Sequence, residues 1–578
     1  MPDGYVKTVP MRRGNLSLLS AAALAIVFSL LHARGGLLQA QTQTSVALTG
    51  QVRSAEEGLM EGVLVSARKG GATFTVTVVS DLQGRYRFPA AKVEPGLYSL
   101  SIRAVGYDLG SPGAVTISPQ RTATADLTLR KTRDLASQLT NAEWAASIPG
   151  TEQQKNTFVN CGDCHSVERI VRSRFDANAW ETVLDRMSSY ASNAFPPMPQ
   201  KRPAPRQGGG ENPLDQRLEA RRRQAEFLAS INLSSTPEWK YDLKTFPRPK
   251  GLATQVIYTE YDLPARTRQP HDAILDSQGT VWYGSFGEQI LGKLDPGTGK
   301  TTEYKVPLVR PGFPTGSLAV RFDEDENIWL ANMFQGAIQK FDRKTETFQT
   351  WSLPPDMLRD WSQLTEVSPN HHKVDGKVWI VESGTYTLLR LDTASGRFES
   401  FEPYPIPRPN VYDVMSDAQN NAYFTVIGRE RIGRIDAKTG KITFYQTPTP
   451  NSAPRRGMLD SQGRIWFGEN RVNQVGTFAT RTERFQEWPV PTPYSQPYDA
   501  TVDKNGEVWT GGEWTDRVIR LNPTTGQFVE YLLPTSTNIR RVIVDNATTP
   551  VTFWVGDDLG ASIVKLEPLD LTAKTESR

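Results

Sequence analysis

The sequence contains only two cysteines and five histidines among its 578 residues. So few cysteines exclude a fold held by several disulfides and a zinc site made of four thiolates. An excess of one charge is also missing, because 66 basic and 63 acidic residues leave a net charge of +3. We therefore expect neither nucleic acid nor an anionic membrane surface as a partner. The sequence also lacks a glycine-rich nucleotide-binding fingerprint.

Long apolar runs are scarce as well, and the one at residues 16–31 follows Arg12 and Arg13. A membrane-spanning helix needs about 20 residues, and this run is shorter. With the Leu-Gln-Ala sequence that ends at Ala40, it predicts a signal peptide over residues 1–40. We expect a periplasmic or secreted protein without a membrane span after signal cleavage.

Glycine, proline and tryptophan are plentiful, with 45, 40 and 13 residues. Together with short alternating apolar runs they indicate mostly β structure. Because single domains rarely exceed about 250–300 residues, the length indicates several domains. We expect a mainly β, multidomain protein.

Residues 45–131 alternate polar and apolar side chains between regular turn signals, which predicts a β-sandwich. Its motifs, in the order G-x-V, G-V-x-V, D-x-x-G-x-Y-x-F, P-G-x-Y and G-Y, resemble those of carboxypeptidase regulatory-like domains. The resemblance implies a stalk or adhesion module, and we interpret this segment as a spacer without catalytic residues.

The two cysteines stand in the motif Cys161-Gly162-Asp163-Cys164-His165. The C-x-x-C-H spacing puts two thiols on one helical turn, where they add to the vinyl groups of a c-type haem, and the histidine becomes an axial iron ligand. A thioredoxin-like redox pair does not require the histidine, and a zinc site needs two more ligands at suitable spacing. We predict one covalent haem c.

The apolar period changes to 3.6 over residues 137–235, which predicts three helices. A capping box at Thr151 and Gln154 marks the first, and Asp176 and Asn212 mark the starts of the others. Three helices around C-x-x-C-H resemble a small monohaem cytochrome c domain. This segment would then bury the haem.

Two methionines are candidates for the sixth iron ligand. Met187 lies on the apolar face of the second predicted helix, in an Arg-Met pair that resembles a group of bacterial cytochrome domains. Met198 lies in a proline-rich loop like the one that supplies methionine in ordinary cytochromes c. We favour Met187 and keep Met198 as the alternative.

An internal repeat occupies residues 254–568, with an aromatic marker in each unit at Trp282, Trp329, Trp379, Tyr423, Trp466, Trp509 and Trp554. Seven units of four short strands predict a seven-bladed β-propeller. The last unit lacks an outer strand, and residues 256–264 match the missing one. We expect the blade built from both ends to close the propeller, because closure removes exposed strand edges.

The repeat contains the motifs W-x-x-x, I-G-x-x-D and x-T-x-Y-x-x-P, and this pattern resembles that of the virginiamycin B lyase family. The resemblance implies a magnesium-dependent, ring-opening elimination by a histidine and a glutamate at the propeller mouth. Counting along the repeats puts His271 at the start of an inner strand, and Glu382 and Glu469 at the ends of second strands. No repeat carries both residue types. His371 and His372 are further candidates beside Glu382.

We predict that the rim binds a small polar molecule or a partner loop through charged side chains at His271, Glu382, Arg455, Glu469 and Asp557. A Mg²⁺ ion bridged by Glu382 or Glu469 is a further expectation.

Three functions remain open. The first is electron transfer through the haem, with the propeller binding a redox partner protein or a small polar molecule. The second is an enzyme, either a propeller lyase or a dehydrogenase that passes electrons to the haem. The third is a binding protein with a structural haem. The haem motif favours the first function, because an elimination transfers no net electrons and would leave a haem without a role.

Overall fold

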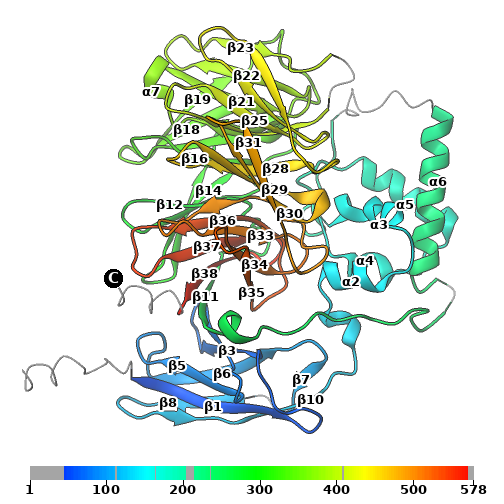
Figure 1. The fold of residues 1–578 in the computed structure, drawn as a ribbon, viewed down its shortest axis with the longest axis vertical. Coiled ribbons are helices and arrows are strands. Elements are labelled where there is room, and N and C mark those ends of the chain that lie inside the picture. Colours follow the sequence, from blue (N-terminus) through cyan, green and yellow to red (C-terminus); the bar gives the residue numbers. More distant parts are fainter. Residues whose placement is uncertain are drawn as a thin grey trace, which may run out of the picture.

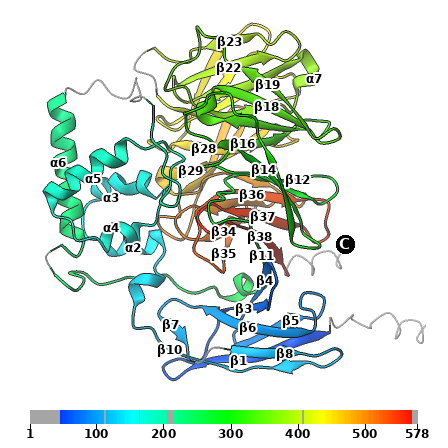
Figure 2. The same ribbon diagram turned by 180° about the vertical axis from the view of Figure 1, so that it is seen from behind.

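The computed structural model describes six stretches of the chain: residues 45–110, 113–162, 164–203, 214–234, 236–405 and 409–569. They form a mainly β, multidomain protein. Figures 1 and 2 show a β-sandwich below a propeller, with a group of helices beside the propeller. The predicted signal peptide lies outside the described residues. Within the described residues, no helix is long and apolar enough to cross a membrane.

The sandwich consists of two sheets. One contains β1 (Val46–Ser54), β2 (Gly58–Leu59), β5 (Arg85–Pro89), β7 (Tyr107–Leu109), β9 (Ala123–Thr124) and β10 (Leu127–Lys131). The other contains β3 (Leu64–Lys69), β4 (Phe74–Val79), β6 (Gly96–Arg103) and β8 (Gly113–Ile117). Alternate side chains, among them Leu48, Val65 and Phe88, are buried in the core between the sheets, which accounts for the period of two in the sequence.

The sandwich shares a sheet with the propeller instead of standing apart as the spacer suggested by the sequence. Strand β4 pairs antiparallel with β11 (Val256–Asp262), with Thr77 opposite Tyr258. An ion pair between Arg68 and Asp262 links strands β3 and β11. The second sheet of the sandwich and the last propeller blade are therefore one eight-stranded sheet.

Seven four-stranded blades make up the described part of the propeller. Blades 1 to 3 are β12 (Ala273–Leu275), β13 (Val281–Gly284), β14 (Ile290–Asp295), β15 (Lys300–Lys305); β16 (Ser317–Phe322), β17 (Ile328–Asn332), β18 (Ala337–Asp342), β19 (Thr347–Ser352); and β20 (Leu364–Ser368), β21 (Lys377–Glu382), β22 (Thr387–Asp392), β23 (Phe398–Phe401). Blades 4 to 6 are β24 (Val411–Ser416), β25 (Ala422–Val426), β26 (Arg431–Ile435), β27 (Ile442–Gln446); β28 (Pro454–Leu459), β29 (Arg464–Glu469), β30 (Gln474–Ala479), β31 (Arg484–Pro489); and β32 (Thr501–Val502), β33 (Val508–Gly512), β34 (Arg517–Asn522), β35 (Gln527–Leu532).

Blade 7 closes the ring as predicted. It contains β36 (Ile539–Asp545), β37 (Thr552–Asp557) and β38 (Ser562–Pro568), and β11 from the start of the propeller is its fourth strand. The pairing of β11 with β38 runs from Val256 opposite Pro568 to Asp262 opposite Ser562. Short helices lie between strands at η4 (Met333–Gln335), α7 (His372–Asp375) and η5 (Asn470–Val472).

Four of the marker tryptophans are fixed by an aspartate six residues earlier. In blade 1 one Asp276 oxygen accepts hydrogen bonds from the backbone of the inner turn, and the other accepts from Trp282 Nε1 at 3.0 Å. Trp329, Trp466 and Trp509 bind Asp323, Asp460 and Asp503 in the same way. One side chain therefore fixes both the turn and the buried aromatic of the next strand, which explains the repeat in the sequence.

The helical domain, which we define as residues 134–246, has its own core around Trp144, Trp180 and Leu228. Its helices are η1 (Leu135–Gln138), α2 (Asn141–Ser147), α3 (Glu152–Lys155), η2 (Asn156–Cys161), α4 (Val167–Val171), α5 (Ala177–Ser188) and α6 (Leu214–Ile231), and η3 (Gly251–Thr254) follows it. The capping box at Thr151 and the cap at Asp176 are confirmed, whereas the predicted start at Asn212 lies outside the described residues.

The first predicted helix is shorter than expected, because α3 changes into the 3-10 helix η2 before the cysteines. Leu218 of α6 lies on the outer side of the helix, since 52% of its surface is exposed. Part of the core comes from elsewhere: Trp514 of the propeller is buried in it, and Trp239 and Phe246, after the predicted domain end, pack against it.

Candidate functional site

The predicted attachment motif forms one helical turn. The backbone N–H groups of Cys164 and His165 both donate to the carbonyl oxygen of Cys161, each at 3.3 Å. Both cysteine side chains are half-buried. Asp163 lies outside the described residues. The two cysteines and the histidine therefore lie within five residues on one turn.

The His165 imidazole is arranged as a metal ligand would be. Its Nδ1 lies 3.0 Å from the backbone oxygen of Ser166, so that nitrogen carries the proton and donates it, and Nε2 keeps a lone pair. Burial lowers the pKa of His165, and the nearby Arg169 lowers it further. The ring is therefore neutral at pH 7 and Nε2 is available as an electron-pair donor.

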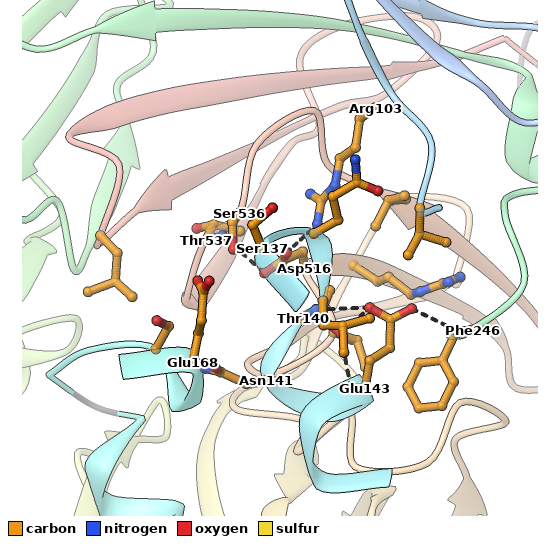
Figure 3. Close-up of a pocket in the computed structure, with 18 of the residues that line it drawn as sticks. Arg103, Ser137, Thr140, Asn141, Glu143, Glu168, Phe246, Asp516, Ser536 and Thr537 are labelled. Carbon is orange, nitrogen blue, oxygen red and sulfur yellow. Dashed lines mark hydrogen bonds and ion pairs between the residues drawn. The ribbon is translucent and has the colours of Figure 1, made fainter. Parts of the chain in front are cut away.

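A cavity of about 490 Å³ lies beside this turn, where the sandwich, the helical domain and the propeller meet. Cys164 and His165 line it together with the loop at residues 195–197. Figure 3 shows Arg103 of the sandwich pointing toward Asp516 of the propeller, and their charged groups are 2.5 Å apart.

The same cavity is bounded by a buried carboxylate. Glu143 accepts hydrogen bonds from the backbone N–H of Phe246, at 2.7 Å, and from Thr140, as Figure 3 shows. Burial raises the pKa of Glu143, although these hydrogen bonds oppose the rise. The cavity thus has a polar wall in addition to apolar surfaces from Ile102, Leu139 and Pro247.

The two candidate methionines differ in position. Met187 lies in the last turn of α5, and 38% of its surface is exposed. Met198 lies in the loop whose residues 195–197 line the cavity, and its sulfur is near Gly287 of blade 1. Both stay candidates for the sixth ligand.

At the propeller mouth, His271 is part of a buried polar cluster. Its Nδ1 is 2.9 Å from Oδ1 of Asp272, and its Nε2 is 3.2 Å from the hydroxyl of Tyr498, which also bonds to the hydroxyl of Tyr412. Only 2% of the His271 surface is exposed, and burial lowers its pKa to about 3. The neutral ring therefore donates a hydrogen bond from Nδ1 to Asp272 and accepts a hydrogen bond from the Tyr498 hydroxyl at Nε2.

Arg455 belongs to the same cluster. Its guanidinium lies over the ring of Tyr498, 4.2 Å from the centroid, and one of its nitrogens is 2.6 Å from Glu513. Glu513 also pairs with Arg540 and is 1% exposed. The structure therefore brings His271 and Arg455 together, as predicted, through Tyr498.

The three acidic residues predicted for the rim do not join this cluster. Glu382 accepts hydrogen bonds from the backbone N–H groups of Gln363 and Thr385, at 2.5 and 2.6 Å, and so caps its own turn. Asp557 similarly accepts from Gly560 N–H at 2.8 Å. Burial raises the pKa of Asp557 to about 7.

Glu469 lies in blade 5, where Pro454 is its partner across the strands. Neither of its carboxylate oxygens has a hydrogen-bond partner in the described part of the chain. Burial and the neighbouring Glu487 raise the pKa of Glu469 to about 8. The side chain is therefore mostly protonated at pH 7.

His371 and His372 cannot assist Glu382. They precede β21 (Lys377–Glu382) and Glu382 ends it, so the length of the strand separates them. The described residues hold no group of three or more His, Cys, Asp or Glu side chains that suits a metal ion. The magnesium site stays a prediction.

A ring of ion pairs below His271 was not predicted. Asp272 pairs with Arg321 and Arg456, and an oxygen of Glu366 lies 2.6 Å from Arg321 and 2.8 Å from Arg456. These four side chains, from blades 1, 2, 3 and 5, fill the centre of the propeller. Burial raises the pKa of Glu366 to about 7 against the opposing effect of the arginines. A charged residue ten positions before the marker, which recurs in four repeats, was a signal for Asp272 and Arg456 but not for Arg321 and Glu366.

The helical domain covers the mouth. Asn193 Nδ2 donates to the carbonyl oxygens of Phe286 and Thr315, at 3.0 and 2.5 Å. Gln200 binds Gly287 and Thr315, and Gln363 of blade 3 binds Ser192. On the other side Tyr494 of blade 6 donates to Glu152 of α3 at 2.7 Å. These contacts explain why His271 is enclosed.

Two family profiles match the sequence. The Virginiamycin B lyase family matches residues 310–568, and the Carboxypeptidase regulatory-like domain matches residues 47–130. Both matches support the resemblances seen in the motifs. Neither covers residues 137–235, and the haem domain stays a prediction. No curated protein matches the chain.

Solved structures similar to this chain include two lyases. Selenomethionine-substituted virginiamycin B lyase from Staphylococcus aureus is 21% identical with a TM-score of 0.46, and the match covers 54% of this chain and 99% of that one. A streptogramin B lyase structure is 23% identical with a TM-score of 0.48, covering 55% and 99%.

Proposed function

We propose that the protein is an exported c-type cytochrome that transfers electrons through one covalent haem. In this proposal the propeller holds the haem domain and binds a small polar molecule or a redox partner protein. One observation carries it: Cys161, Cys164 and His165 form a single turn beside a cavity of about 490 Å³. That volume lies within the range of about 300–1,000 Å³ that is usual for ligand and cofactor sites.

The residues present fit a haem. Cys161 and Cys164 would hold it through thioether bonds, and Nε2 of His165 would be the first axial ligand. The hydrogen bond from Nδ1 to the Ser166 oxygen orients the imidazole and fixes its tautomer. When bound, a haem supplies reversible one-electron chemistry at its iron. The chain's part is to orient this ligand and to keep water from one side of the site.

For the sixth ligand we propose Met187, with Met198 as the alternative. Met187 lies on the same helix as the core residue Trp180, whereas Met198 follows residues 195–197, which line the cavity. Ferric haem with a methionine ligand has a weak far-red absorption band. Met187→Ala should abolish that band, and Met198→Ala should leave it. The reverse result would assign the ligand to Met198.

The haem itself is tested by staining for haem peroxidase activity on a denaturing gel, after expression with a c-type maturation system. A stained band at the mass of the mature protein is expected, because thioether bonds survive denaturation. The double variant Cys161→Ser, Cys164→Ser should give no band. Absence of the band in the unaltered protein would refute the proposal.

The propeller's own site is, in this proposal, the cluster around His271, Arg455 and Tyr498. Hydroxyl, imidazole and guanidinium groups in one enclosed place suit a small polar ligand with an oxygen-rich or anionic group. Calorimetric titration with candidate ligands tests this, and Arg455→Ala should weaken any binding that is found.

The second candidate is an elimination on the propeller, which the Virginiamycin B lyase family match favours. Such a reaction requires a large cyclic lactone, and not only a small polar molecule, to reach His271, whose surface is 2% exposed. We therefore expect no magnesium-dependent turnover of a streptogramin lactone. Turnover that is lost in His271→Ala would establish this candidate instead.

A further inference from the structure

Two propeller residues contact the predicted haem-attachment turn directly. The Asn538 side chain donates a hydrogen bond from Nδ2 to the carbonyl oxygen of Gly162, at 2.8 Å. Trp514 lies against the same residue: a β-carbon at position 162 would be 2.7 Å from Nε1 of Trp514. Gly162 thus stands between the two cysteines and also at the contact with blades 6 and 7.

Both residues are buried inside the protein. Asn538 has no exposed surface and Trp514 has 2%. Trp514 packs in the core of the helical domain although it belongs to the propeller, and its carbonyl oxygen accepts a hydrogen bond from Ala142 N–H at 2.9 Å. The contact is therefore a packed interface with specific hydrogen bonds.

The chain on either side of these two residues continues into the cavity wall. Thr515, Asp516 and Arg517 follow Trp514 and line the cavity, and Ser536 and Thr537 precede Asn538 and line it too. The propeller therefore contributes a wall of the space beside His165, in addition to holding the turn.

We propose that Trp514 and Asn538 are positioning residues for the haem, so that the propeller completes a haem site that the helical domain does not form alone. This inference rests on the proposed covalent haem. A docked turn keeps water from the haem and so lowers the dielectric constant around it. A low dielectric constant disfavours the ferric form, because that form carries one more positive charge than the ferrous form. Loss of the contact should lower the reduction potential.

The test uses the full-length holoprotein. Asn538→Ala removes one hydrogen bond at a position remote in sequence from the cysteines, and Gly162→Ala introduces a clash with the Trp514 indole. Spectroelectrochemistry should give a lower reduction potential for both variants. Oxidation of the reduced protein by oxygen should be roughly tenfold faster, because the loss of one buried hydrogen bond shifts the docking equilibrium of the turn by about that factor. Trp514→Phe, which keeps an aromatic ring, should show a smaller change than Trp514→Leu.

Gln527→Ala, at an exposed position in blade 6 of the same propeller, is the matched control and should behave as the unaltered protein. If Asn538→Ala does not fold, Asn538→Ser replaces it. Folded variants with unchanged potential and unchanged oxidation rate would overturn the inference. An unaltered protein without covalent haem would instead refute the proposed function, so the two failures are distinguishable.

Discussion

The sandwich and the helical domain are both packed on the propeller, but they are joined to it differently. The sandwich is joined through the backbone ladder between β4 and β11, so one sheet runs through both. The helical domain is joined mainly through side chains: its Asn193 and Gln200 bind propeller loops, and Asn538 and Trp514 of the propeller contact its Gly162. The first connection is continuous, whereas the second consists of separate contacts.

This difference has a physical consequence. A strand ladder forms and breaks cooperatively, and its apolar side chains are part of one core. Side-chain hydrogen bonds to loops can each be exchanged for water at a net cost of about 0.5–1.5 kcal/mol. We therefore expect the sandwich to unfold together with blade 7, and the helical domain to detach from the mouth more easily.

The largest effect is expected at Leu64, which has no exposed surface. This β3 residue belongs to the same buried cluster as Tyr258, Phe553 and Leu566 of the propeller. Leu64→Ala should lower the free energy of unfolding by about 2–5 kcal/mol, because it leaves a cavity between the two domains. Urea unfolding followed by tryptophan fluorescence measures the change.

The control is Leu97→Ala on β6, where 62% of the leucine surface is exposed. It should change stability by about 0.5 kcal/mol or less. If Leu64→Ala is equally harmless, or if it destabilises the sandwich while the propeller unfolds as before, the shared sheet does not couple the two domains.

A smaller effect is expected from Asn193→Ala combined with Gln200→Ala. The change removes the side-chain donors to the carbonyl oxygens of Phe286 and Thr315, at a cost of about 1–3 kcal/mol for each buried group. We expect the helical domain to loosen with little change in the unfolding of the propeller. His271 should then react with diethylpyrocarbonate, as measured by mass spectrometry of the peptides.

His371 provides the internal reference for that labelling, since 31% of its side chain is exposed in the unaltered protein. It should react equally in both proteins. Protection of His271 that persists in the double variant would show that the mouth is closed by other contacts.

The last effect concerns pH. The pKa of Glu469 is about 8 in the folded protein against an ordinary value of 4.5, so the folded state holds a proton that the unfolded state has lost between these values. Stability should therefore fall as pH rises from about 4.5 to 8 and stay level above that. Glu469→Gln should remove this part of the slope, and melting temperatures at pH 5 and pH 8.5 measure it.

The variant should be as stable as the unaltered protein near pH 4.5 and more stable than it at pH 8.5. Glu483→Gln, at an exposed position in the same blade, should keep the original slope. A slope unchanged by Glu469→Gln would contradict the burial of a protonated carboxyl group there.

Local patterns sufficed for most of the fold. The Asp276–Trp282 spacing and its repeats define the blades, because one hydrogen bond and one turn recur within six residues. The outer strand at 256–264 could be matched to blade 7, because its residue pattern repeats that of the other outer strands. The candidate site was less predictable, since register alone does not say whether Glu382 points to the channel or caps its own turn.

The sequence by itself determined the seven blades, the sandwich and the order of Cys161, Cys164 and His165, since each depends on residues that are near one another in the chain. Only the tertiary structure decided that β4 extends blade 7, that the mouth is covered, and that Trp514 meets Gly162. These contacts join residues hundreds of positions apart. They depend on the shapes of surfaces that form only after each domain has folded. No local periodicity in the sequence therefore predicts these contacts.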